Sequence, residues 1–192
     1  MIAQIRGLLI EKTPTYVIID CGGVGYELKI SLNTFSQIGT GKECMLFTHF
    51  VVREDAQILY GFKETSEREL FRLLISVSGV GSATAIMILS SLSPNETKGA
   101  ILTGDVNTLK SVKGIGAKSA ERIIIDLRDK IGKIDGATIS LTPNNTIKEE
   151  ALSALVMLGF SKNPAEKALT KTLSSGEELT VEELIKRTLK NL

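Results

Sequence analysis

The chain has 192 residues, of which 43% are hydrophobic and 23% are charged, and its formal net charge is +1. This composition is typical of a folded protein and excludes a disordered or collagen-like chain. With 17 Gly, 4 Pro, no Trp and 5% aromatic residues, the sequence favours several small domains over one large aromatic core.

Residues 1–62 carry the pattern of a small all-β domain. Short runs rich in β-branched and aromatic residues alternate with turn-forming residues. The expected strands are Ile2–Ile10, Thr15–Asp20, Gly25–Ile30, Glu43–Arg53 and Gln57–Phe62, with a short helix near Asn33–Ile38. Such a strand set predicts a closed OB-fold barrel, and an SH3-like barrel with similar spacing is the alternative.

The hydrophobic spacing becomes helical after this segment and predicts an all-helical domain over residues 63–131. The expected helices are Glu67–Ile75, Ser82–Leu92, Asn95–Leu102, Val106–Val112 and Ala117–Ile131. Two similar turns join them, Val-Ser-Gly-Val-Gly at 77–81 and Val-Lys-Gly-Ile-Gly at 112–116. Their similarity indicates an internal duplication.

The two glycine turns are the strongest candidate binding sites in the sequence. In each turn the first glycine permits a positive φ, and the second lets an anion approach the backbone closely. A helix begins directly afterwards, and its free N–H groups are suited to hold a phosphate. Segment 110–130 has six basic residues against three acidic ones, and Lys118 and Arg122 share one helix face.

These features favour a role in binding the DNA backbone. The alternative is a helical hairpin in which the glycines only make a tight corner. The first turn lacks a basic residue, so its backbone amides and nearby hydroxyls would have to make the contacts. The candidate DNA-binding residues are Gly79, Gly81, Ser82, Gly114, Gly116, Lys118 and Arg122.

Residues 132–146 are predicted to form a flexible linker, because they contain glycine, proline and an Asn-Asn pair without hydrophobic periodicity. Residues 147–192 are predicted to form a third domain of three short amphipathic helices, Ile147–Leu158, Pro164–Leu173 and Thr180–Leu189. Thr146 with Glu149, and Thr180 with Glu183, have the spacing of capping boxes.

No catalytic, metal or cofactor site is predicted. Neither 39–43 nor 114–118 matches a nucleotide-binding P-loop, so we expect no ATP hydrolysis by this chain. His49 has no nucleophile or acid at triad spacing and is predicted to be structural. Cys21 and Cys44, with a single histidine in the chain, are too few for a structural zinc site.

The sequence predicts a cytoplasmic protein without a membrane segment. Charged residues interrupt the apolar N-terminus, so no signal-peptide core forms. The uncharged stretch Leu73–Asn95 is long enough to span a bilayer, but its serine, threonine and glycine residues fit a buried hairpin better.

The two glycine turns look like tandem helix-hairpin-helix motifs, which bind DNA phosphates without reading bases. With the barrel before them and the helical module after them, the whole chain resembles the RuvA family of Holliday-junction-binding proteins. The sharpest similarity lies in residues 50–62 and 114–122. The resemblance implies a homotetramer that holds a four-way DNA junction open in recombination and repair. It also implies a RuvB-type hexameric ATPase as partner and allows the resolvase RuvC as another.

The resemblance assigns two further sets of residues. Acidic pins at the centre of the tetramer map onto Glu54 and Asp55, for which the alternative is an ordinary polar hairpin tip. Residues 155–160 resemble the Met-Gly-Phe turn of UBA-like three-helix modules, which suggests that the motor docks there. The candidate docking residues are Leu155, Met157, Leu158 and Phe160, for which the alternative is packing in the small core.

Two other functions are weighed against a non-enzymatic junction-binding subunit. A helix-hairpin-helix DNA glycosylase would need a catalytic aspartate placed by a larger helical domain than this one. A single-strand-binding barrel protein would bind unpaired DNA more tightly than a junction.

Overall fold

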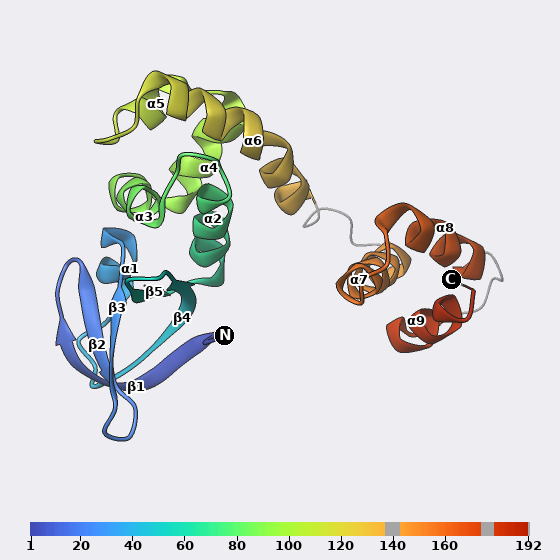
Figure 1. The fold of residues 1–192 in the computed structure, drawn as a ribbon, viewed down its shortest axis with the longest axis horizontal. Helices are drawn as coiled ribbons and strands as arrows, with labels where there is room; N and C mark the ends of the chain where they lie inside the picture. The colour runs from blue at the N-terminus through green and yellow to red at the C-terminus, as the bar shows by residue number, and fades with distance from the viewer. Residues whose placement is uncertain (137–142, 174–178, 192) are drawn as a thin grey trace. The chain divides into compact units, whose positions relative to one another are not determined.

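The computed structural model describes residues 1–136, 143–173 and 179–191. The chain divides into two compact units, Met1–Gly132 and Lys133–Leu192 (Figure 1). The first unit contains a β-barrel followed by a helical domain, and the second contains three helices.

The barrel is built from β1 (Gln4–Lys12), β2 (Tyr16–Asp20), β3 (Gly25–Lys29), β4 (Glu43–Val52) and β5 (Gln57–Phe62). The strands close in the order β1-β2-β3-β5-β4, with β1 also paired to β4. The β3–β5 pair is parallel and the other pairs are antiparallel, and helix α1 (Leu32–Gln37) lies between β3 and β4 in sequence. This topology confirms the predicted OB-type barrel.

The barrel interior is filled by side chains that alternate along the strands, as a half-buried sheet requires. The residues at its centre are fully buried and aliphatic. They are Val17, Ile19, Leu28 and Leu46.

The helical domain consists of α2 (Thr65–Ile75), α3 (Ser82–Ser91), α4 (Pro94–Thr103), α5 (Val106–Lys110) and α6 (Ala117–Gly136). The stretch Leu73–Asn95 is divided between α2, α3, the start of α4 and the turns between them. Within the described ranges, no helix is both long and apolar enough to cross a membrane.

The barrel and the helical domain share one hydrophobic core. Tyr60 and Phe62 of β5 belong to the same buried cluster as Leu70 and Phe71 of α2. The ring centroid of Phe71 lies 5.0 Å from those of both Tyr60 and Phe62. Because only two residues separate β5 from α2, this packing makes the two domains one unit.

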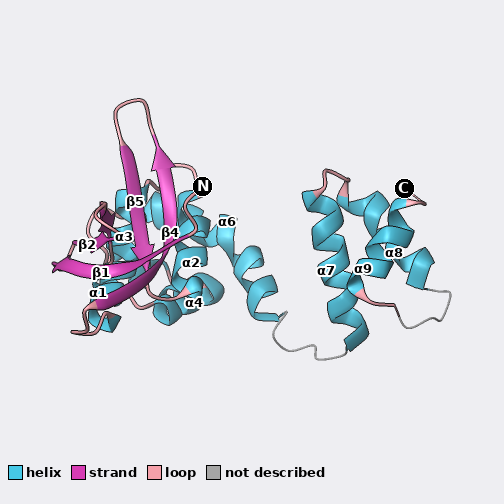
Figure 2. Cartoon of the chain, turned by 90° about the horizontal axis from the view of Figure 1, so that it is seen from below, coloured by secondary structure: helices cyan, strands magenta, loops and turns pink. Residues whose placement is uncertain are grey.

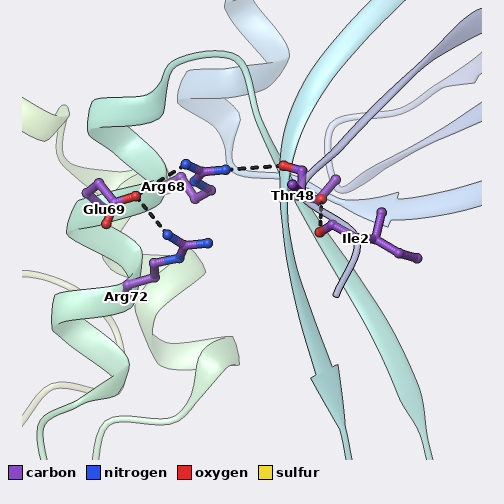
Figure 3. A network of polar contacts seen from close by, with 6 residues as sticks. Ile2, Thr48, Arg68, Glu69 and Arg72 are labelled. Carbon is purple, nitrogen blue, oxygen red and sulfur yellow. Dashed lines mark hydrogen bonds and ion pairs between the residues drawn. The ribbon is translucent and has the colours of Figure 1, made fainter. Parts of the chain in front are cut away.

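A polar contact also joins α2 to the chain just before β1. Arg68 Nη1 donates a hydrogen bond to the carbonyl oxygen of Ala3 (3.1 Å), and its guanidinium lies over the ring of Phe47 at 5.4 Å. Figure 3 shows Arg68 reaching from α2 to the chain beside Thr48, whose hydroxyl donates to the carbonyl of Ile2 (2.6 Å).

The second unit contains α7 (Pro143–Met157), α8 (Lys162–Leu173) and α9 (Val181–Leu189), packed around a small aliphatic core. Thr180 Oγ1 accepts from the N–H of Glu183, and the Glu183 carboxylate accepts from the N–H of Thr180. The predicted capping box at α9 is therefore confirmed.

Helices extend into both ends of the segment predicted to be a linker. Helix α6 continues to Gly136 and α7 begins at Pro143, so Thr146 lies inside α7 and not at its first residue. Proline suits the first position of a helix, where its missing N–H costs nothing, and glycine weakens a helix without forbidding it. The central part of the predicted linker, 137–142, lies outside the described residues.

Candidate nucleic-acid interface

The two glycine turns have the same backbone conformation. Gly79 and Gly114 both have a φ of 90°. In the first turn the N–H of Val80 donates to the carbonyl of Val77 (3.0 Å), and in the second the N–H of Ile115 donates to that of Val112 (3.1 Å). All four of these apolar side chains are buried, so each turn is anchored from below while its glycines face solvent.

The fold of this chain does not require glycine at the second glycine position of each turn. Gly81 and Gly116 do not have a positive φ, and a Cβ built on either would meet nothing within 4 Å. A residue with a side chain would therefore fit both positions of the free protein. The open space at these glycines suits the close approach of an external group to the backbone.

The helices that follow the turns leave amide groups free for such a group. Gly81 is the N-cap of α3 and provides no side chain to bond the first N–H groups of the helix. The first intrahelical bonds are those of Ala85 to Gly81 (2.9 Å) and Ala120 to Gly116 (3.0 Å). The N–H groups before them, with the positive end of the helix dipole, can hold an anion.

Lys118 and Arg122 are exposed on α6, whose opposite face is buried through Ile123 and Leu127. Arg122 Nη1 donates to the carbonyl oxygen of Ser78 in the first turn (3.3 Å). The second hairpin therefore supplies a basic side chain at the first glycine turn, which has none in its own sequence.

A shallow depression of about 300 Å³ lies between the two hairpins. It is lined by Ser78, Gly79, Lys118, Ser119 and Arg122. Ser78 and Ser119 were not predicted as site residues. The sequence places a serine near a glycine in each turn, but only the fold brings these serines and the two basic side chains together.

Ser82 lies at the start of α3 with only 6% of its surface exposed. Little of the Ser82 side chain is therefore open to solvent, and contact of its hydroxyl with DNA stays a prediction. Its backbone N–H, in the first turn of α3, keeps a place in the candidate site.

Glu54 and Asp55 lie at the tip of the β4–β5 hairpin, where the N–H of Arg53 donates to the carbonyl of Ala56 (2.8 Å). Figure 2 shows this hairpin projecting away from the helices of the first unit. Both acidic residues are exposed, and no ion pair to either is found among the residues that the structure describes. A negatively charged tip of this kind repels phosphates that come near it.

The four predicted docking residues fall into two groups. Leu155 is fully buried in the core of the second unit, so for this residue the packing alternative holds. Met157, Leu158 and Phe160 are 86%, 62% and 36% exposed. Gly159, with a φ of 99°, ends α7, and the N–H of Phe160 donates to the carbonyl of Leu155 (3.1 Å). This C-cap lies among the three exposed side chains Met157, Leu158 and Phe160.

His49 packs edge-on against Phe71, with 5.4 Å between ring centroids. Burial lowers the pKa of His49 below its usual value, and the nearby Arg72 and Arg68 lower it further. An uncharged imidazole against an aromatic ring fits the structural role predicted for this residue.

Three family models match the chain. They are the RuvA N terminal domain over residues 1–61, a SAM-like helix-hairpin-helix tandem over 71–129 and the RuvA C-terminal domain over 146–192. The Holliday junction branch migration complex subunit RuvA of Christiangramia forsetii is 54% identical over 193 residues, covering all of both chains. The chain belongs to the RuvA family. This confirms the resemblance found in the sequence.

Other RuvA relatives are similar over the same extent. The subunit of Flavobacterium psychrophilum is 51% identical and that of Bacteroides fragilis 48% identical, each over the whole of both chains. RuvA proteins are DNA-binding subunits, and the tandem helix-hairpin-helix model covers both glycine turns of this chain.

Proposed function

We propose that this chain binds Holliday junctions and holds them open as the DNA-binding subunit of a branch migration complex. The observation that carries this proposal is the pair of equivalent glycine turns, joined by Arg122 and open to an external anion, in a chain that matches RuvA over its whole length.

DNA binding would use the phosphate backbone rather than the bases. The free amides after Gly81 and Gly116 would each hold a phosphate, and Lys118 and Arg122 would neutralise neighbouring ones. Because all DNA sequences share these phosphates, such contacts suit a junction whose sequence changes as it migrates.

The acidic hairpin tip would supply the selectivity for a junction. In a tetramer with four-fold symmetry, four copies of Glu54 and Asp55 would lie where four duplexes meet. Their charges would repel phosphates at the centre and guide separated strands into different grooves. An uninterrupted duplex across the centre would be repelled in the same way.

The motor activity would belong to a partner. A RuvB-type hexameric ATPase would hydrolyse ATP and dock on the exposed Met157, Leu158 and Phe160 of the second unit. The resolvase RuvC would act on the same junction. As a protein of recombination and DNA repair, this chain would work where the chromosome lies, in the bacterial cytoplasm.

Truncation after Thr142 tests the division of labour between the two units. The shortened chain keeps the barrel and both glycine turns, so we expect its affinity for a four-way junction to stay within about twofold of the full-length value. We expect stimulation of the motor's DNA-dependent ATPase to be lost. A gel-shift titration and an ATPase assay measure the two quantities.

The full-length chain with Met157→Ser is the matched comparison, because Met157 is 86% exposed and its replacement leaves the core intact. It should weaken motor stimulation without changing junction binding. Full stimulation by the truncated chain would exclude the docking role of the second unit.

A further inference from the structure

A buried carboxyl group joins the barrel to the helical domain. Glu67, in the first turn of α2, is fully buried. Its two carboxylate oxygens accept hydrogen bonds from the hydroxyls of Ser31 and Thr34, the latter at 2.7 Å. Ser31 is the N-cap of α1 and Thr34 lies within α1, and both side chains are fully buried.

Backbone N–H groups also reach both hydroxyl oxygens of this network. Ser31 Oγ accepts from the N–H of Thr34 (2.9 Å), and Thr34 Oγ1 accepts from the N–H of Lys63 (3.2 Å). Each hydroxyl oxygen thus receives a backbone N–H, and its own proton points to Glu67. Both oxygens of Glu67 accept a hydroxyl proton, so α1 holds the whole carboxyl group.

Burying a carboxyl group is costly unless its hydrogen bonds are satisfied. No ion pair to Glu67 is found within the described part of the chain. An apolar residue at this position would stabilise the core at less cost, but it would not hold α1 in one orientation. Directed hydrogen bonds add an angular preference to the apolar packing of Phe71 against Tyr60 and Phe62.

The network sits at the point where the two domains meet. Lys63 belongs to the short connection between β5 and α2. A further bond, from the N–H of Leu32 to Ser90 Oγ (3.1 Å), ties α1 to α3. Arg68, the residue after Glu67, bonds the barrel at Ala3 (Figure 3). Consecutive residues of α2 therefore hold different parts of the barrel.

We propose that Glu67 is a positioning residue that fixes the angle between the barrel and the helical domain. This inference rests on the proposed function. The barrel carries the acidic tip at Glu54 and Asp55, and the helical domain carries both glycine turns. A fixed angle sets where the acidic charges lie relative to the bound phosphates, and thereby sets the preference for a junction over a duplex.

The substitution Glu67→Gln tests this role with almost no change in shape. The glutamine amide donates where the carboxylate accepted, so the proton of one hydroxyl loses its acceptor. We expect the affinity for plain duplex to stay within about twofold and the junction-to-duplex preference to fall by about tenfold. Amide hydrogen exchange should become faster in peptides covering 31–37 and 62–68.

Glu64→Gln is the control, because it removes the same charge from an exposed residue whose side chain does not cap α2. It should leave the preference unchanged. Thr34→Val is the second variant and should lower the preference as Glu67→Gln does. The junction-to-duplex preference of the double variant should fall by less than the summed free-energy effects of the two single variants, because both changes break the same hydrogen bond.

A role limited to stability would lower the melting temperature of both variants and leave the junction-to-duplex preference unchanged, and that result would overturn the proposal. A wild-type chain without any junction preference would instead overturn the proposed function itself. If Glu67→Gln fails to fold, Thr34→Val alone decides the question by the same criterion.

Discussion

Gly116→Val is expected to weaken junction binding by about a hundredfold or more while the protein stays folded. Gly116 has an ordinary φ, and a Cβ there meets nothing within 4 Å, so the free chain can accept valine. The branched side chain would fill the space through which a phosphate reaches the amides that begin α6. Valine is a poorer N-cap than glycine, which costs stability by about 1 kcal/mol.

For Gly116→Val, binding titrations measure the loss of affinity and thermal unfolding measures the loss of stability. Lys118→Ala should be milder, with a loss of about tenfold and a salt dependence shallower by about one unit, because it removes a single phosphate contact. Lys130→Ala, an exposed residue farther along α6, is the matched control and should change neither quantity. Wild-type affinity in folded Gly116→Val would show that DNA does not approach this turn.

The double substitution Glu54→Gln with Asp55→Asn should bind DNA more tightly than the wild-type chain. At the centre of a junction complex these carboxylates face phosphates, so neutralising them removes a repulsion. We expect a gain of about tenfold at low ionic strength and a smaller gain at physiological salt. The preference for junction over duplex should fall, because the repulsion that excludes a continuous duplex is lost.

Titrations of a junction and a duplex at two salt concentrations test this result. Glu27→Gln with Glu43→Gln is the control, because it removes the same charge from two exposed strand residues. The ion pairs of these residues contribute little to folding stability. A solvated tip far from DNA predicts the same result for both double variants. Equal behaviour of the two would therefore exclude the pin role and leave the phosphate contacts of the glycine turns unaffected.

Most of the fold could be predicted from local patterns in the sequence. Strand alternation and helical periodicity are set by which face of an element is buried, and Gly79 and Gly114 mark turns whose positive φ glycine adopts most easily. The start of α7 was missed because Pro143 and the Asn pair after it are typical of loops as well as of helix starts.

The details of the site depend on contacts between distant segments, which local patterns do not contain. The bond from Arg122 to Ser78 joins the two hairpins across 44 residues of sequence. The burial of Ser82 and Leu155 depends on how each helix packs, which the residues around the two turns do not indicate. The network around Glu67 gave no sequence signal, because an acidic residue in the first turn of a helix is ordinary.

The comparison of affinities for three DNA forms tests the central claim most directly. A four-way junction, a duplex of the same sequence and length of arm, and a single strand are titrated with the full-length chain at one physiological salt concentration. We predict that the junction binds most tightly, by about a hundredfold over the duplex, and the single strand most weakly. Equal affinity for junction and duplex, or tightest binding to the single strand, would contradict the account.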